Sequence, residues 1–255
     1  MQTQTQSLTQ RLANPTRFME LSGALMPWVA AAAAALILYG LYLAFFDSPP
    51  DYQQGETVRI MYIHVPSAWL SMMAYGLIAV SSFGLLVFRH PLADVSAKAA
   101  VPIGAAFTFL ALLTGSLWGK PMWGTYWVWD ARLTSMLVLF FLYLGLMALR
   151  SSLEDETLAA KLTSVLALVG VTLLPIIKFS VNWWNTLHQP STGMGMTLDP
   201  SMRRPLWIMA LGFTLMFFAM HMQAMRNEIL RRRVKSLRMS DVARRDGAAE
   251  TVAAE

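Results

Sequence analysis

The sequence predicts an all-α integral membrane protein with six transmembrane helices. Of its 255 residues, 56% are hydrophobic and only 14% are charged, whereas a soluble domain carries about 25% charged residues. A helix needs roughly 20 apolar residues to cross a bilayer, and six stretches are close to that length or longer. They lie near residues 23–46, 65–88, 99–118, 133–149, 162–181 and 205–225.

These stretches differ in how strongly they predict a span. The first, second, third and sixth contain no Asp, Glu, Lys or Arg. The first is also longer than the 7–15-residue core of a signal peptide and no clear cleavage site follows it, so we expect it to be retained. The fourth is short, and the fifth contains Pro175 and Lys178. We predict one membrane domain over residues 1–225 and a basic, then Ala-rich, tail over 226–255.

The basic residues predict the orientation of the chain. With six spans both termini share one side, and 14 of the 20 Lys and Arg residues fall on that side. Because cytoplasmic loops are enriched in Lys and Arg, both termini are predicted to be cytoplasmic. The loops near 47–64, 118–132 and 182–204 then face the periplasm of a bacterial inner membrane. The basic tail is explained as a topology signal, or as a surface for anionic lipid or a cytoplasmic partner.

Tryptophan is concentrated between the third and fourth spans, in WGKPMWGTYWVWDAR at residues 118–132. Single tryptophans commonly anchor helices at membrane interfaces, but such anchors are scattered and this segment carries a cluster. A sheet of indole rings complements a ligand that is flat, large and apolar. If residues 122–130 are helical, two of the rings share one face. We predict an interfacial platform that includes Trp118, Trp123, Trp127, Trp129 and, from the next loop on this side, Trp184.

Two of the four histidines, His64 and His188, fall on the same predicted face as the tryptophans. His90 and His221 fall toward the opposite face, where we expect structural roles. Two imidazoles are too few for an ordinary zinc site, although Asp130 and Asp199 are available to complete one. Haem provides four ligands to its iron and needs only two axial partners. The residues therefore favour a haem site and leave a metal-ion site as the alternative.

Charged residues add to this interpretation. Haem carries propionates, and guanidinium groups pair with carboxylates through two hydrogen bonds. The chain has no cysteine, which excludes disulfides and thioether attachment of haem. Its basic residues are clustered rather than spread over a surface, which argues against a nucleic-acid partner. The predicted propionate partners are Arg59, Arg132, Arg203 and Arg204.

Three segments together carry a resemblance to a known family. The tryptophan motif WGTYWVWDARLTS, flanked by YIHVPSAW and NWWNTLHQPS, resembles the CcmC family of haem-handling (WWD-domain) proteins in system I cytochrome c maturation. The resemblance extends from the first span to the last. It implies that His64 and His188 are axial ligands of non-covalently bound haem b. It also implies that Asp130 belongs to the platform with the tryptophans.

The resemblance also implies partners. The family presents haem to the periplasmic chaperone CcmE, whose histidine becomes bonded to a haem vinyl group. It works with the small membrane protein CcmD and with the ABC transporter subunits CcmA and CcmB. The chain has no nucleotide-binding loop, which agrees with ATP hydrolysis in a partner and with a haem-transfer component that is not itself an enzyme.

Two other functions remain open at this point. The first is a membrane transporter that moves haem or another substrate between its helices, because Pro175 and Lys178 could mark a broken helix. The second is a b-type cytochrome in electron transfer. We further expect that Asp130 and Arg132 orient a partner or a propionate rather than the iron.

Overall fold

The computed structural model describes residues 14–188 and 198–253, and within these ranges the chain is nearly all helical. These ranges contain no strand, only an isolated bridge between Asp51 and Gly55. The helices, in order, are α2 (Pro15–Tyr42), the π-helix η1 (Leu43–Asp47), the 3₁₀ helix η2 (Glu56–Ile60), α3 (Met61–Phe88), α4 (Pro91–Trp123), α5 (Ala131–Ser151), α6 (Glu156–Gly170), α7 (Leu173–Trp183) and α8 (Pro200–Ala253).

Six helical segments are long and apolar enough to cross a membrane, and each contains one of the predicted spans. They are Pro15–Asp47, Glu56–Phe88, Pro91–Trp123, Ala131–Ser151, Glu156–Trp183 and Pro200–Arg244. The prediction of an all-α protein with six spans is confirmed. The segments extend beyond the predicted spans because helix continues past the apolar core into more polar sequence.

Local chemistry explains where several helices begin and end. The side chain of Asp130 accepts the N–H of Leu133 at the start of α5, and that of Asp155 accepts two N–H groups at the start of α6. Each carboxylate satisfies donors that the first helical turn leaves unpaired. Gly124, with φ of 74°, ends α4 in the left-handed conformation that glycine adopts without a steric penalty. Gly124 and Asp130 therefore define where the connection between α4 and α5 begins and ends.

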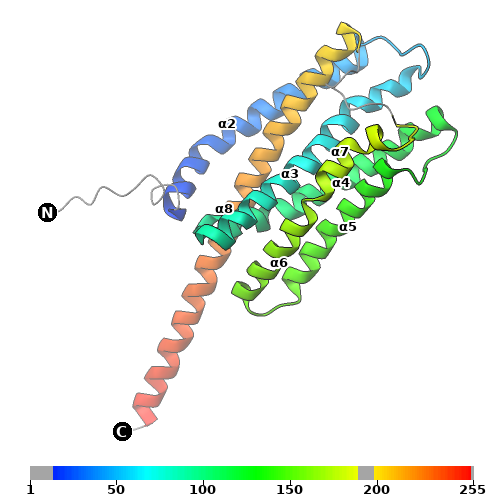
Figure 1. Cartoon of the computed structure of the whole chain (residues 1–255). Helices are drawn as coiled ribbons and strands as arrows, with labels where there is room; N and C mark the ends of the chain where they lie inside the picture. Colours follow the sequence, from blue (N-terminus) through cyan, green and yellow to red (C-terminus); the bar gives the residue numbers. More distant parts are fainter. Residues whose placement is uncertain (1–13, 189–197, 254–255) are drawn as a thin grey trace.

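The helices pack around α3. In Figure 1, α2 lies along α8, and α8 separates α2 from the rest of the bundle. Helix α3 contacts α4, α6 and α8, while α5 contacts α4, α6 and α7. The largest fully buried side chains come from several of these helices, among them Tyr62 and Tyr75 of α3, Tyr143 of α5 and Phe217 of α8. The centre of the bundle is thus closed by large side chains.

Two elements differ from the sequence-based expectation. Helix α4 continues through Lys120 and Pro121 to Trp123, so 122–130 is not one helix, and residues 127–130 form no regular secondary structure. The fifth span is broken at Val171 and Thr172, between α6 and α7. Pro175 stands in the first turn of α7, where its missing N–H costs little.

Helix α8 is much longer than a membrane span. Its 54 residues correspond to about 80 Å at ~1.5 Å per residue. Figure 1 shows its C-terminal part projecting past the ends of the neighbouring helices. The predicted basic tail is therefore a helical continuation of the sixth span over the described residues.

Candidate functional site

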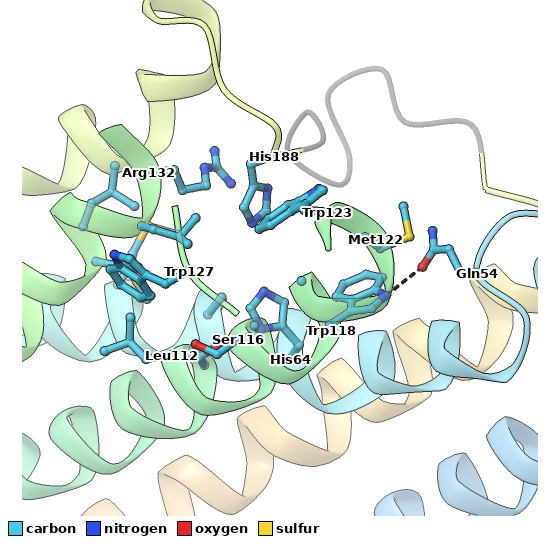
Figure 2. Close-up of a pocket in the computed structure, with 18 residues that line it drawn as sticks. Gln54, His64, Leu112, Ser116, Trp118, Met122, Trp123, Trp127, Arg132 and His188 are labelled. Atoms are coloured by element: carbon cyan, nitrogen blue, oxygen red, sulfur yellow. Dashed lines mark hydrogen bonds between the residues drawn. The ribbon is translucent and has the colours of Figure 1, made fainter. Parts of the chain in front are cut away.

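A cavity lies at the end of the bundle where the tryptophan-rich segment connects α4 to α5. The empty space within it is about 900 Å³ when the open solvent at its mouth is included, so it is an open cleft rather than an enclosed chamber. Helices α3, α4, α5 and α7 form its walls, and the segment after α7 closes one side (Figure 2). The side chains that carry the argument below are Gln54, His64, Trp118, Trp123, Trp127, Arg132 and His188, all of which line it.

His64 and His188 face each other in this cavity although 124 residues of sequence separate them. Their ring centroids are 6.4 Å apart and the ring planes are inclined by 34°. A bond from an imidazole nitrogen to a first-row metal ion is about 2.0 Å long, and a ring nitrogen lies about 1.1 Å from its ring centre, so two imidazoles on opposite sides of one metal have centroids roughly 6 Å apart. The pair therefore has the spacing that bis-imidazole ligation requires.

The orientation of His64 is set by helix α4. Its Nδ1 lies 3.0 Å from the carbonyl oxygen of Ala111 and 3.1 Å from Oγ1 of Thr114. A carbonyl can only accept, so Nδ1 carries the hydrogen and Nε2 keeps its lone pair. This is the arrangement that metal-binding histidines commonly have, with the second ring nitrogen donating to a carbonyl. Gly115 makes it possible, because a Cβ there would lie 2.9 Å from Cε1 of His64.

The segment that carries His188 is fastened to the start of α5. The backbone N–H of His188 donates to Oγ1 of Thr186 over 3.0 Å. The Thr186 hydroxyl in turn donates to Oδ2 of Asp130, while Oδ1 of Asp130 accepts the N–H of Leu133 over 2.7 Å. One carboxylate thus caps α5 and fixes, through Thr186, the backbone of His188.

Three tryptophans line the cavity beside the histidines, as Figure 2 shows. Trp118 packs edge-on against His64 with centroids 5.7 Å apart, and its indole N–H donates to Oε1 of Gln54 over 2.7 Å. Trp123 lies 6.0 Å from His188, centroid to centroid. The indole N–H of Trp127 is buried without a hydrogen-bond partner among the described residues. An unpaired buried donor is costly, so its place in the cavity wall suits a ligand with an acceptor.

The remaining predicted platform residues do not line the cavity. Trp129 is 77% exposed and packs edge-on against Trp127, with centroids 5.6 Å apart. Trp184 is 57% exposed because α7 ends at Trp183 and the chain turns outward in extended conformation. Asp130 contacts backbone and Thr186 rather than the cavity. Of the tryptophans predicted to form the platform, Trp118, Trp123 and Trp127 line the cavity.

Of the four arginines predicted to meet propionates, only Arg132 lines the cavity. Its Nη2 also lies 3.3 Å from the carbonyl oxygen of Lys178. Arg59 is directed elsewhere, because its guanidinium donates to the carbonyls of Ala44 and Ser48 and pairs with Glu56. Arg203 and Arg204 are exposed in the first turns of α8, where Arg204 donates to the hydroxyl of Tyr39 over 2.7 Å.

The other two histidines lie away from the cavity, toward the opposite end of the bundle. His221 is buried, stacks on Phe217 and lies 3.2 Å from the hydroxyl of Ser96. His90 precedes α4 and makes no side-chain cap. Across residues 14–188 and 198–253, no group of three or more His, Asp or Glu side chains could hold a metal ion.

Three residues of this site were not found from the sequence. Gln54, Gly115 and Thr186 are common residue types in positions that become informative only once helices distant in sequence are brought together. Gly115 stands one turn after Ala111, but no pattern in the sequence links it to His64. Residues 189–197, within the third predicted loop, lie outside the described residues.

Comparison with known proteins agrees with the motifs. The family model described as Heme exporter protein C matches residues 8–240. Heme exporter protein C of Bradyrhizobium diazoefficiens is 62% identical over 236 residues, covering 91% of this chain and 89% of the relative. The Escherichia coli K12 protein of the same name is 50% identical over 220 residues, 86% and 90% of the two chains.

A more distant relative comes from a plant. A protein of Marchantia polymorpha named as a ccmC-like mitochondrial protein of cytochrome c biosynthesis is 48% identical over 180 residues, covering 70% of this chain and 76% of the relative. Together with six apolar helices, these matches indicate a multi-pass membrane protein. The chain belongs to the heme exporter protein C family.

Proposed function

We propose that this protein holds haem b non-covalently at the periplasmic face of the bacterial inner membrane and delivers it to CcmE for the maturation of c-type cytochromes. Haem handling in cytochrome c biogenesis is the role of the family to which the chain belongs. The observation that carries the proposal is the His64–His188 pair, whose rings face each other across the cavity at 6.4 Å.

In this proposal the two histidines are the axial ligands of the haem iron. Iron bound by four porphyrin nitrogens and two imidazoles has no open position, which protects it from oxygen. His64 is supported by Ala111 and Thr114 and offers Nε2. His188 is supported through its backbone by Thr186 and Asp130. The two ligands come from separate elements, so each contributes to binding on its own.

The tryptophans and Arg132 bind the rest of the haem. Trp118 and Trp123 flank the histidines edge-on or tilted, and their rings cover apolar porphyrin surface. Arg132 lines the cavity, and its guanidinium would pair with a propionate in this proposal. Asp130 does not touch a propionate or the iron in this proposal. It positions His188 through the hydroxyl of Thr186.

Delivery of haem to CcmE would depend on the cavity enclosing the haem only in part. The cavity is open at one side, so the vinyl edge of bound haem would be reachable by the histidine of CcmE. By its family, the chain works beside CcmD and an ABC-type complex of CcmA and CcmB, and the relatives carry the name of an exporter. The chain supplies binding and presentation, and ATP hydrolysis belongs to the partners.

Presentation at one face is better supported than transport through the bundle. The interior beyond the cavity is filled by Tyr75 and Tyr143, both fully buried and packed edge-on with centroids 5.4 Å apart. A b-type cytochrome is less well supported, because its haem lies between helices within the membrane, whereas His64 lies in the first turn of α3 and His188 follows the end of α7.

The visible absorption spectrum of the purified protein tests the proposal. We expect a low-spin haem spectrum in the wild type, weaker binding with a high-spin component in His64→Ala or His188→Ala, and loss in the double variant. His90→Ala, which removes a histidine at the far end of α3, is the matched control and should keep the wild-type spectrum. Wild-type haem content and spin state in both single variants would refute the axial assignment.

A further inference from the structure

A second cavity lies at the opposite end of the bundle, between α3 and α4 on one side and α5 and α6 on the other. Its volume is about 370 Å³. Its polar rim includes Ser82, Lys98, Arg150 and Thr163, and its walls include Val101 and Leu146. The buried pair Tyr75 and Tyr143 lies between this cavity and the histidine cavity, and the Tyr143 hydroxyl donates to the carbonyl of Ser71 over 2.6 Å. The second cavity is therefore a separate site.

The walls of this cavity suit an aliphatic chain rather than a flat aromatic ring. The described residues that line it include Ile78, Val101, Pro102, Leu146 and Met147, and none of the lining residues is aromatic or a histidine. The histidine cavity, by contrast, is lined by indoles. Ring stacking and iron ligation, which would select haem, have no counterpart among the described residues here.

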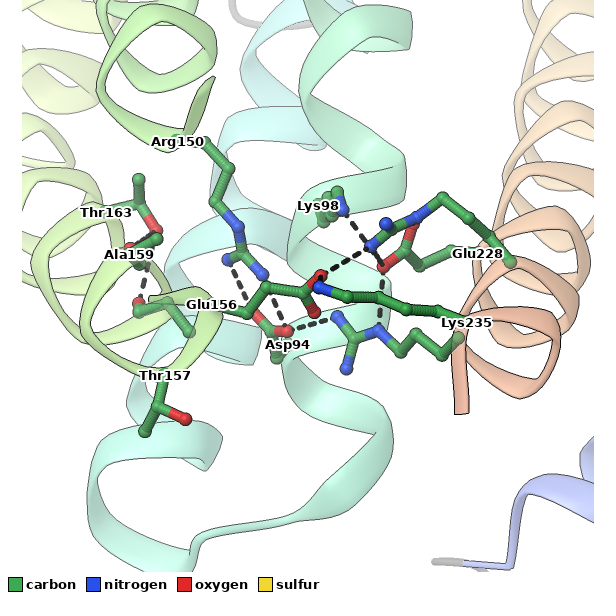
Figure 3. A network of polar contacts seen from close by, with 12 residues as sticks. Asp94, Lys98, Arg150, Glu156, Thr157, Ala159, Thr163, Glu228 and Lys235 are labelled. Atoms are coloured by element: carbon green, nitrogen blue, oxygen red, sulfur yellow. Dashed lines mark hydrogen bonds and ion pairs between the residues drawn. The ribbon is translucent and has the colours of Figure 1, made fainter. Parts of the chain in front are cut away.

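The two charged residues that line this cavity, Lys98 and Arg150, are both basic and belong to a larger ion-pair network beside it. Figure 3 shows the network in which Arg150 pairs with Asp94, and Lys98 pairs with Glu228. Arg232 joins both carboxylates, while Arg231 and Lys235 bind Glu156. Among the described residues of this network, five basic side chains share three carboxylates. Lys98 is 29% exposed and Nζ uses one of its three donors on Glu228.

We propose that this second cavity binds an anionic phospholipid. One acyl chain lies between α3–α4 and α5–α6, and the phosphate meets Lys98 and Arg150 at the rim. An apolar groove that opens beside cations at a helix end is the arrangement by which membrane proteins bind acidic headgroups. This proposal does not depend on haem binding, because none of its residues lines the histidine cavity.

Native mass spectrometry of the full-length protein, released from bilayers of equal phosphatidylglycerol and phosphatidylcholine, measures the retained lipid. We expect the wild type to retain phosphatidylglycerol in preference to phosphatidylcholine. In Lys98→Gln the preference should fall about fivefold, the effect of one cation near an anionic headgroup. Glu228 keeps Arg231 and Arg232 as partners in that variant. Lys161→Gln removes an exposed cation of α6 that does not line the cavity, and should behave as the wild type.

A second variant tests the apolar part of the site. Ser164→Leu introduces bulk into the cavity wall while leaving every charge in place, and should reduce retention of both lipids. An unchanged haem spectrum in each variant shows that the distant cavity is intact. Equal retention of the two lipids by the wild type, or equal preference in Lys98→Gln and Lys161→Gln, would overturn the proposal. So would displacement of the retained phosphatidylglycerol by added haem.

Discussion

At the scale of single residues, the histidine cavity depends on contacts that involve no ligand. The imidazole of His64 lies against α4 where Gly115 has no side chain, and Nδ1 reaches the Ala111 carbonyl. The backbone of His188 depends on the hydroxyl of Thr186, two residues earlier, and through it on the carboxylate of Asp130 at the start of α5. These supporting residues fix the ring of His64 and the backbone of His188.

Gly115→Ala is expected to weaken haem binding by about 10–100-fold, the usual cost of disturbing the support of a metal ligand. The new methyl group would lie 2.9 Å from Cε1 of His64, so the ring must move away from Ala111. Haem titration followed by absorbance measures the change. Gly76→Ala is the matched control, because a Cβ at that glycine of α3 meets nothing within 4 Å. Equal affinities in the two variants would contradict the role given to Gly115.

Thr186→Val is expected to loosen His188 without removing it. The substitution keeps the shape of the side chain but loses the hydroxyl that joins Asp130 to the backbone of His188. We expect a high-spin component in the spectrum and roughly tenfold weaker binding, with both restored in Thr186→Ser. A wild-type spectrum in Thr186→Val would show that Asp130 does not position His188 through this hydroxyl.

At the scale of elements, ion pairs join α8 to the helices it crosses. Asp94 in the first turn of α4 accepts two hydrogen bonds from Arg150 of α5, at 2.5 and 2.9 Å, and another from Arg232 of α8. Three helices therefore meet at one carboxylate that is only 8% exposed.

Asp94→Asn is expected to destabilise the bundle by roughly 2 kcal/mol or more. Removing one partner of a fully buried pair costs about 3–5 kcal/mol, and the cost here is lower because Arg232 is 31% exposed. Thermal unfolding in detergent measures it. Glu56→Gln removes a carboxylate that is 69% exposed, and an exposed pair contributes only about 0–1 kcal/mol. Similar midpoints for the two variants would contradict the importance of the Asp94 contacts.

The elements also show how far the sequence could predict the fold. Hydropathy located all six spans, because burial in lipid requires long apolar runs whatever the neighbouring helices are. The continuation of α4 to Trp123 was missed, since Gly119, Lys120 and Pro121 resemble a turn signal. The contacts of Arg59 were also missed. Its guanidinium binds the backbone carbonyls of Ala44 and Ser48, and because every residue has a backbone carbonyl, the sequence does not mark these two. Histidine and tryptophan motifs were informative because those residue types are rare and chemically specific.

At the scale of the whole molecule, two cavities lie at opposite ends of one bundle, with buried tyrosines between them. One end carries histidines and indoles, and the other carries an ion-pair network and the projecting part of α8. The two ends are therefore chemically specialised, which agrees with a fixed orientation in the membrane. The predicted orientation places the histidine end in the periplasm.

Single cysteines test that orientation, since the chain has none of its own. Tyr52, 93% exposed beside the histidine end, and Ser152, exposed at the C-cap of α5 at the other end, are suitable positions. A membrane-impermeant maleimide applied to cells with a permeable outer membrane should label Tyr52→Cys and leave Ser152→Cys unlabelled until the inner membrane is opened. The reverse pattern would invert the proposed orientation.

The hydrogen bond from His64 to the Ala111 carbonyl also has an electronic consequence. A histidine that donates from Nδ1 becomes a more basic ligand through Nε2, and a more basic axial ligand stabilises ferric over ferrous iron. If haem were bound as proposed, this contact would favour the ferric state, since hydrogen bonding around the histidine ligands tunes haem potentials. The backbone of α4 would thus influence the oxidation state in which the site holds haem most tightly.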